Sequence, residues 1–319
     1  MNQNPNHALA NPYESLPLLK KGAMAALKLL YKFLPRSWYE RIYHPAFASY
    51  QKMLRAEYWL RWKLGSRAND SQNLKMKQRV HAVMPYSLVG AVGLEHTHQR
   101  AREVLAKSVP GAFVECGVAR GGCAAILAMV AAEDDRRCWF FDSFAGLPDP
   151  TDEDFQEGKT GDHVRPLPRG SCYGGIEQVS QLLFEQLGIN RNMVRLVKGW
   201  FQDTCSQAAE GVGTIAFLRI DGDWYDSTKL CLEIFYDQVA LGGCLLIDDY
   251  FSCYGARKAT DEFIHQRELE VRLVSDGRGG CSFHKPDESR ENGSSTSLLK
   301  SVAYPLSCTD PLELHGHGC

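Results

Sequence analysis

Two spacings of apolar residues alternate along the central part of the chain. Short apolar runs typical of buried strands occur at 112–116, 137–141, 194–197, 214–220 and 244–247. Apolar residues at helical spacing predict helices over 98–107, 123–132, 176–187, 202–209, 226–239 and 255–267. Buried strands that alternate with helices indicate an α/β fold built on a parallel sheet.

The end of this pattern predicts a change of strand direction. The segments 271–275 and 280–284 flank the turn sequence Asp276-Gly277-Arg278-Gly279, which is typical of a hairpin between two strands. We therefore expect seven strands, five parallel ones followed by two more, one of which is antiparallel. The segment 145–174, rich in Gly, Pro and Asp, is predicted to be a long loop.

The first 80 residues have a different character. Residues 18–34 repeat apolar residues with lysines between them, and residues 38–62 alternate aromatic and arginine side chains. Residues 1–80 carry 14 Lys and Arg against 4 Asp and Glu, whereas the whole chain has a net charge of −2. We interpret residues 1–80 as a basic, aromatic-rich helical extension, residues 81–285 as the α/β domain, and residues 286–319 as a mobile tail.

Three roles compete for residues 18–64 of this extension. In order of preference they are a packing or oligomer contact, a peripheral contact with an anionic membrane, and a nucleic-acid patch. The first role predicts a homo-oligomer. No nucleic-acid partner is expected, because the segment has no signature of RNA or DNA binding. No run reaches the roughly 20 apolar residues of a membrane-spanning helix.

The composition suits one large α/β core in a reducing compartment. Of the 319 residues, 44% are hydrophobic and 23% are charged, which is typical of globular domains. The 11 cysteines form no C-x-x-C pair, which argues against a disulfide framework or a structural zinc site. We expect the protein in the cytoplasm, where residues 18–64 could also hold it at the surface of a membrane.

Four aspartates follow two of the predicted strands. Asp221 and Asp223 come after 214–220, and Asp248 and Asp249 come after 244–247. Any one of them is more simply explained as a turn or helix cap, but ligands bind at the carboxyl ends of parallel strands. Crowded carboxylates repel one another unless a cation or protons neutralise them, and oxygen ligands favour Mg²⁺ over Zn²⁺. Together the four indicate a metal site.

A glycine-containing turn follows the strand 112–116. It reads Glu115-Cys116-Gly117-Val118-Ala119-Arg120-Gly121, or E-x-G-x-x-x-G. Glycines there let a ligand approach the backbone, but the pattern is neither a dinucleotide nor a Walker motif. The next strand ends in Asp142, where an acidic side chain can accept hydrogen bonds from ribose hydroxyls; a cap of the following turn is the alternative.

These motifs together resemble the macrocin O-methyltransferase family, S-adenosylmethionine-dependent enzymes that methylate sugar hydroxyls on natural products. The resemblance is carried by F-V-E-C-G-V-A-R-G-G at 113–122, F-D-S-F-A-G-L-P at 141–148, L-R-I-D-G-D-W-Y-D-S-T at 218–228 and L-L-I-D-D-Y at 245–250. It implies a class I methyltransferase fold, a Rossmann-like sheet of seven strands ending in an antiparallel hairpin.

The resemblance also implies roles for single residues. Glu115, Gly117 and Gly121 would surround the methionine part of S-adenosylmethionine, with Asp142 on the ribose and Ser143 nearby. Asp221, Asp248 and Asp249 would bind Mg²⁺ or Mn²⁺, and Asp223 would be the general base. Such roles suit the reaction, because a sugar hydroxyl is a poor nucleophile that a cation polarises while a carboxylate removes its proton.

Two departures from the family concern the acceptor. Ala119 stands where relatives carry an aromatic residue, and the lid-like stretch 91–96 lacks their basic residue and Asn. The acceptor is therefore expected to be a sugar hydroxyl of a small molecule or glycan without further definition. A catechol or phenol O-methyltransferase and a non-catalytic scaffold on a methyltransferase fold are the alternatives. His96 and His98 are expected to have surface or packing roles, since residues two apart do not share a helical face.

Overall fold

A computed structural model describes residues 49, 52–64, 71–155, 166–167 and 169–286. The predicted helix 18–34, the first part of the aromatic segment and the predicted tail from residue 287 lie outside the described residues. No described helix is both long and apolar enough to cross a lipid bilayer.

Seven strands form one sheet in the order β3-β2-β1-β4-β5-β7-β6. Strands β1 to β5 are parallel, and β7 runs antiparallel to both β5 and β6. The predicted sheet and its terminal hairpin are thus confirmed. The strands are β1 (Ala112–Cys116), β2 (Cys138–Asp142), β3 (Val194–Lys198), β4 (Ile215–Ile220), β5 (Val239–Ile247), β6 (Val274–Ser275) and β7 (Cys281–His284).

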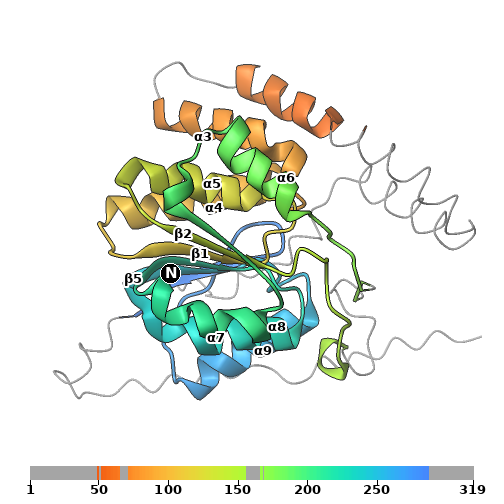
Figure 1. Ribbon diagram of the computed structural model, residues 1–319, viewed down its shortest axis with the longest axis vertical. Coiled ribbons are helices and arrows are strands. Elements are labelled where there is room, and N and C mark those ends of the chain that lie inside the picture. The colour runs from red at the N-terminus through yellow and green to blue at the C-terminus, as the bar shows by residue number, and fades with distance from the viewer. Residues whose placement is uncertain (1–48, 50–51, 65–70, 156–165, 168, 287–319) are drawn as a thin grey trace, which may run out of the picture. The chain divides into compact units, whose positions relative to one another are not determined.

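Helices cover both faces of this sheet, with α3 to α6 on one side and α7 to α9 on the other (Figure 1). Because both faces are covered, every position of β1 and β4 is buried, as is typical of parallel sheets. The helices are α3 (Ser71–Val83), α4 (Gly90–Ala106), α5 (Gly122–Ala131), α6 (Ile176–Ser180), α7 (Phe201–Val212), α8 (Tyr225–Phe235) and α9 (Tyr254–Gln266).

Two apolar cores lie on the two faces. Alternate residues of β1 divide between them: Phe113 packs with the α3 to α5 side, whereas Val114 and Cys116 pack with the α7 to α9 side. This division follows from the two-residue period of side chains along a strand. The sheet is consequently a rigid platform whose carboxyl edge holds the loops after β1, β2, β4 and β5 in place.

Of the predicted boundaries that differ from the structure, three are the most informative. Helix α4 begins at Gly90, not at residue 98, so the stretch 91–96 that we interpreted as lid-like is helical; its packing against the core overrides two glycines that weaken helix propensity. The predicted helix 176–187 is α6 followed by a π-helical segment, Gln181–Gln186. Strand β5 begins at Val239, before the two glycines that hid its start.

The described N-terminal elements pack on the α4 side. Residues 52–64 are helical, and the hydroxyl of Tyr58 donates to Glu95 of α4 at 2.7 Å. Met76 and Val80 of α3 are buried in the same core as α4 and α5. The predicted boundary at residue 80 therefore falls inside α3, and the predicted division into domains stays a prediction.

Candidate active site

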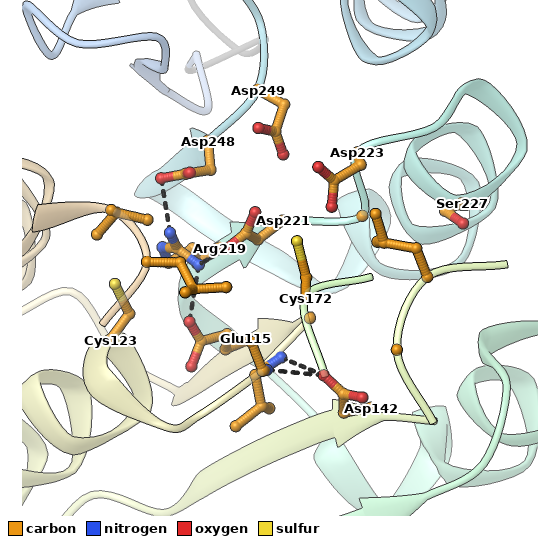
Figure 2. Close-up of a pocket in the computed structure, with 18 of the residues that line it drawn as sticks. Glu115, Cys123, Asp142, Cys172, Arg219, Asp221, Asp223, Ser227, Asp248 and Asp249 are labelled. Carbon is orange, nitrogen blue, oxygen red and sulfur yellow. Dashed lines mark hydrogen bonds and ion pairs between the residues drawn. The ribbon is translucent and has the colours of Figure 1, made fainter. Parts of the chain in front are cut away.

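A cavity of about 350 Å³ opens at the carboxyl edge of the sheet. It lies where β1 and β4 are neighbours, with β2 on one side and β5 on the other, which is the switch point at which open α/β sheets bind ligands. The loops after these four strands supply its walls (Figure 2). Its charged lining consists of six carboxylates and two guanidinium groups: Glu115, Asp142, Asp221, Asp223, Asp248, Asp249, Arg219 and Arg278.

The turn after β1 is held close to the end of β4. Gly117 has a φ of +96°, and a Cβ atom built on it would lie 1.8 Å from the carbonyl oxygen of Asp221. Only glycine permits this approach, so the glycine turn and the first aspartate of β4 share one wall of the cavity. Gly121 does not line the cavity; its α-carbon faces the buried side chains of Val179 and Leu182, and Gly122 lines the cavity instead.

Asp142 fastens this turn to β2. Its Oδ2 accepts hydrogen bonds from the backbone N–H of Val118 at 2.7 Å and of Ala119 at 2.9 Å, and its Oδ1 accepts one from Phe144 at 2.6 Å. The last bond is the turn cap that the sequence offered as the alternative role. Each carboxylate oxygen has two lone pairs, so Asp142 can also accept from a ligand, and Ser143 lines the cavity beside it.

Arg219 is the centre of the charge network. It is fully buried, and its Nη1 donates to Glu115 at 2.8 Å and to Asp221 at 2.7 Å while its Nη2 donates to Asp248 at 2.6 Å (Figure 2). Arg278 from the hairpin turn also pairs with Asp248. One planar guanidinium thus fixes carboxylates from β1, β4 and the loop after β5 relative to one another.

The carboxylates divide into two electrostatic groups. Although burial acts to raise it, the pKa of Asp248 is held below its usual range by Arg219 and Arg278. Burial, followed by repulsion from Asp223 and Asp221, raises the pKa of Asp249. Burial likewise raises the pKa of Asp221 against the attraction of Arg219, and it raises the pKa of Glu115 to about 8. Neutralisation of these carboxylates by protons or by a bound cation is therefore favoured.

Asp223 lies beside this group on a turn of its own. Its φ of +56° places it in the left-handed region, which Asp tolerates better than most residues. Burial, followed by repulsion from Asp221 and Asp248, raises the pKa of Asp223 well above its usual range. Carboxylate oxygens of Asp223 and Asp249 lie within 4.8 Å of each other. Asp223 is thus a base of raised affinity for a proton, next to the other acids.

The acidic group fits a hard divalent cation. Single carboxylate oxygens of Asp221, Asp248 and Asp249 all lie within 4.8 Å of one another. Oδ2 of Asp249 is buried without a hydrogen-bond partner, which costs free energy unless something occupies it. The donor set is all oxygen, as Mg²⁺ and Mn²⁺ prefer. Since both oxygens of Asp248 face arginines, Asp221 and Asp249 offer the freer ligand atoms.

The predicted loop 145–174 contributes a further wall. Gly146, Leu147, Pro148, Leu167 and Cys172 all line the cavity. Two contacts hold its first part on the start of α8. Trp224 Nε1 donates to the carbonyl of Pro148 at 3.2 Å, and the buried Asp154 accepts from the backbone N–H of Tyr225 at 2.7 Å.

Most residues singled out in the sequence meet at this cavity. Glu115, Gly117, Asp142, Ser143 and the four aspartates all line it, and Gly121 does not. Sequence reasoning missed Arg219, Arg278 and Asp154. Arg219 carried a signal, because a charged residue inside an apolar strand requires a buried partner.

The two histidines have the packing role expected of them. His96 and His98 are both buried in α4, and neither lines the cavity. His96 contacts Ser282 at 3.3 Å and His98 contacts Arg79 at 3.4 Å. Burial lowers the pKa of both side chains.

Comparison with known proteins agrees with this geometry. The family model described as Macrocin-O-methyltransferase (TylF) matches residues 24–283, so the match includes much of the extension. Demethyldecarbamoylnovobiocin O-methyltransferase of Streptomyces niveus is 34% identical over 204 residues, which are 63% of this chain and 76% of that protein.

Two further relatives are similar. An enzyme of Streptomyces olivaceus, 8-demethyl-8-(2,3-dimethoxy-alpha-L-rhamnosyl)-tetracenomycin-C 4'-O-methyltransferase, is 36% identical over 171 residues, which are 52% of this chain and 62% of that protein. The solved structure of the O-methyltransferase NovP superposes with a TM-score of 0.54 at 30% identity and covers 63% of this chain and 83% of its own.

Proposed function

Since the chain belongs to the macrocin O-methyltransferase family, we propose that it transfers a methyl group from S-adenosylmethionine to a hydroxyl of a sugar or glycosylated small molecule. The observation that carries this proposal is the carboxylate group at the carboxyl edge of the sheet. Asp221, Asp248 and Asp249 lie close enough together to hold Mg²⁺ or Mn²⁺, with Asp223 beside Asp249. The name of the relative from Streptomyces olivaceus includes a rhamnosyl group, which supports a sugar acceptor.

Each part of the cavity has a role in this proposal. The turn at Gly117 and the carboxylate of Asp142 would hold the cofactor, with the buried Glu115 near its charged methionine end. Asp221, Asp248 and Asp249 would hold the divalent cation, which when bound supplies a positive charge that polarises the acceptor hydroxyl. Arg219 keeps the ligand-bearing strands in register whether or not the cation is present.

The reaction itself asks for alignment and one proton acceptor. The acceptor oxygen forms a bond to the methyl carbon while the bond from that carbon to the cofactor sulfur breaks. Asp223 takes the hydroxyl proton, for which its raised pKa suits it. The walls supplied by β1, β4 and the loop 145–174 hold the reactants in line, which is the larger task because the methyl donor is already activated.

Transfer of a labelled methyl group tests this proposal. The protein is stripped with a chelator and then assayed with L-rhamnosides, other deoxyhexosides and catechol, before and after addition of Mg²⁺ or Mn²⁺. We expect label on a glycoside only after a cation is restored. Label on catechol alone would favour the phenol alternative, and equal transfer without a cation would contradict the metal role.

A further inference from the structure

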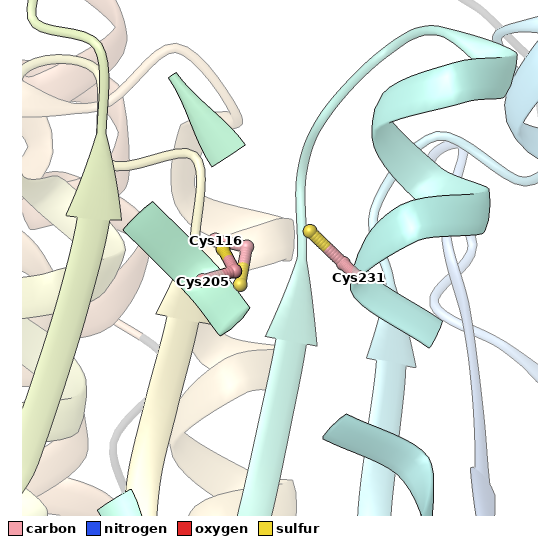
Figure 3. Close-up of side chains that lie close together, drawn as sticks. All are labelled: Cys116, Cys205 and Cys231. Carbon is pink, nitrogen blue, oxygen red and sulfur yellow. The ribbon is translucent and has the colours of Figure 1, made fainter. Parts of the chain in front are cut away.

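Three cysteine thiols lie together away from the active-site cavity. The sulfur atoms of Cys116, Cys205 and Cys231 are all within 4.8 Å of one another, and each residue is fully buried. They come from the end of β1, from α7 and from α8 (Figure 3). All three are free thiols.

Residue spacing does not predict this cluster. The three positions are 89 and 26 residues apart along the chain, a spacing that matches no metal-binding motif. The fold brings them together because Cys116 points to the same face of the sheet that α7 and α8 cover. Three thiols can therefore meet in the fold although no C-x-x-C pair is present.

The surroundings of the cluster are apolar. The thiols belong to the core that includes Val114, Phe141 and Phe235. Among the described residues, no further His, Cys, Asp or Glu joins the three sulfurs in their group. The site therefore offers three soft ligands and no fourth one.

The three thiols are coupled to one another. Hydrogen bonds from Cys116 and Cys231 lower the pKa of Cys205, while burial raises the pKa of both donors. The lowered pKa arises from the neighbouring thiols and not from a basic side chain. Sulfur atoms this close together in an apolar core suit a soft cation that takes the place of their protons.

We propose that Cys116, Cys205 and Cys231 form a trigonal binding site for a soft monovalent cation, Cu(I). Three sulfurs at about 2.3 Å from a central ion lie roughly 4 Å apart, which agrees with the observed grouping. Thiolates select Cu(I) over hard cations, and the missing fourth ligand disfavours tetrahedral Zn²⁺. Each thiol that binds Cu(I) as a thiolate releases one proton, and no oxidation state changes.

The cluster connects three segments of the active-site wall. Cys116 precedes Gly117, Cys205 follows Phe201 by about one helical turn, and Cys231 follows Ser227 by about one turn. Gly117, Phe201 and Ser227 all line the cavity. An ion in the thiol site would tie these three segments to one another.

Copper retention against a competing chelator tests the site. The reduced full-length protein is loaded anaerobically with Cu(I) and then exposed to excess bathocuproine disulfonate, which removes weakly held copper. We expect one copper per chain to remain, with X-ray absorption showing three sulfur neighbours at about 2.3 Å. Folded wild-type protein that keeps no copper, or copper with nitrogen or oxygen neighbours, would overturn the proposal.

Variants locate the retained copper. Cys205→Ser and Cys231→Ala should each lose it. Cys244→Ala is the matched control, because Cys244 is equally buried but belongs to the core on the opposite face of the sheet, and it should keep its copper. The variant Cys172→Ala/Cys253→Ala, which removes two thiols that line the active-site cavity, should keep it as well.

Circular dichroism and thermal melting establish that each variant is folded. Copper retained equally by a folded Cys205→Ser variant would contradict the proposal, as would its loss from Cys172→Ala/Cys253→Ala alone. If the Cys205→Ser variant does not fold, X-ray absorption of the copper-loaded wild-type protein and copper retention by Cys231→Ala still test the proposal.

Discussion

At the scale of the residue, Asp223 differs from the other three aspartates in its grouping. Single carboxylate oxygens of Asp221, Asp248 and Asp249 lie together, and Asp223 groups with only Asp249 of these three. Asp223 is therefore the carboxylate left to take a proton beside a group suited to hold a cation.

Replacing Asp223 by Asn should therefore remove turnover and spare binding. We expect Asp223→Asn to lower the methyl-transfer rate by about 10²- to 10⁴-fold and to leave the affinity for S-adenosylhomocysteine, measured by isothermal titration, unchanged. Asp226→Asn, at an exposed position three residues on, is the control and should keep full activity. A rate for Asp223→Asn near that of the control would remove Asp223 from the role of base.

Arg219 matters to stability as well as to the site. Its replacement by Met leaves three carboxylates without their shared partner, and breaking a buried ion pair costs about 3–5 kcal/mol. We expect Arg219→Met to lower the free energy of unfolding in urea by that amount. Arg169→Met removes an exposed ion pair with Asp149 and should change the free energy of unfolding by less than about 1 kcal/mol. Equal effects of the two substitutions would contradict a central role of Arg219 in the charge network.

The residue scale also shows what sequence can predict about a site. The four aspartates were predictable because residues that follow parallel strands meet at one edge of the sheet. Arg219 was not assigned, since its three partners come from separate strands and loops. The thiol cluster was equally hidden, because it depends on which face of the sheet Cys116 points to and on where α7 and α8 lie.

At the scale of the element, α3 and α4 are joined by a buried histidine. His98 of α4 contacts Arg79 of α3, and burial together with the charge of Arg79 lowers the pKa of His98 to about 4. An unfolded histidine has a pKa of about 6.5. Between pH 6.5 and pH 4 the unfolded chain binds a proton at His98 that the folded chain does not bind. The contribution of neutral His98 to the free energy of unfolding is therefore complete above pH 6.5 and is lost as the pH falls towards 4.

The pH dependence of unfolding measures this effect. Between pH 7 and pH 5, wild-type protein should lose about 2 kcal/mol more of its free energy of unfolding than His98→Gln does. Urea titrations at several pH values provide the comparison. Parallel pH profiles for the two proteins would show that His98 is protonated as easily in the folded chain as in the unfolded one.

Element types were predicted better than element boundaries. β1 was predicted residue for residue, since a buried parallel strand is a continuous apolar run with a glycine turn after it. The start of α4 and the start of β5 were missed because glycines lie at both places, and tertiary packing decides there against local propensity. Misplacing the start of α4 in turn made 91–96 resemble a lid.

At the scale of the whole molecule, the described chain has the class I methyltransferase fold, and its helix at 52–64 contacts α4 through Tyr58 and Glu95. Membership of an enzyme family contradicts the alternative of a non-catalytic scaffold. Several large apolar side chains of the helix at 52–64 are exposed: Met53, Trp59, Leu60 and Leu64. Such a group on one helix is typical of a contact surface.

We expect a second copy of the chain to cover this helix. Sedimentation velocity should show an oligomer for wild-type protein and a monomer for Leu60→Glu/Leu64→Glu. Lys52→Glu changes the charge of an exposed position on the same helix and should leave the oligomer intact. A wild-type monomer at micromolar concentration would contradict this expectation. If that monomer co-sediments with anionic vesicles, a membrane contact of the helix would be favoured instead.

The two contacts that hold the loop on α8 have a consequence for the evolution of new substrates. Pro148 and Asp154 are bonded to Trp224 and Tyr225, directly after the proposed base, so the first part of the loop is anchored beside the chemistry. Substitutions at Leu167, which lines the cavity beyond these anchors, should therefore change acceptor preference without moving Asp223. The catalytic residues and the loop residues that contact the acceptor can therefore change independently. Changes in this loop are the most direct route to altered glycoside preference.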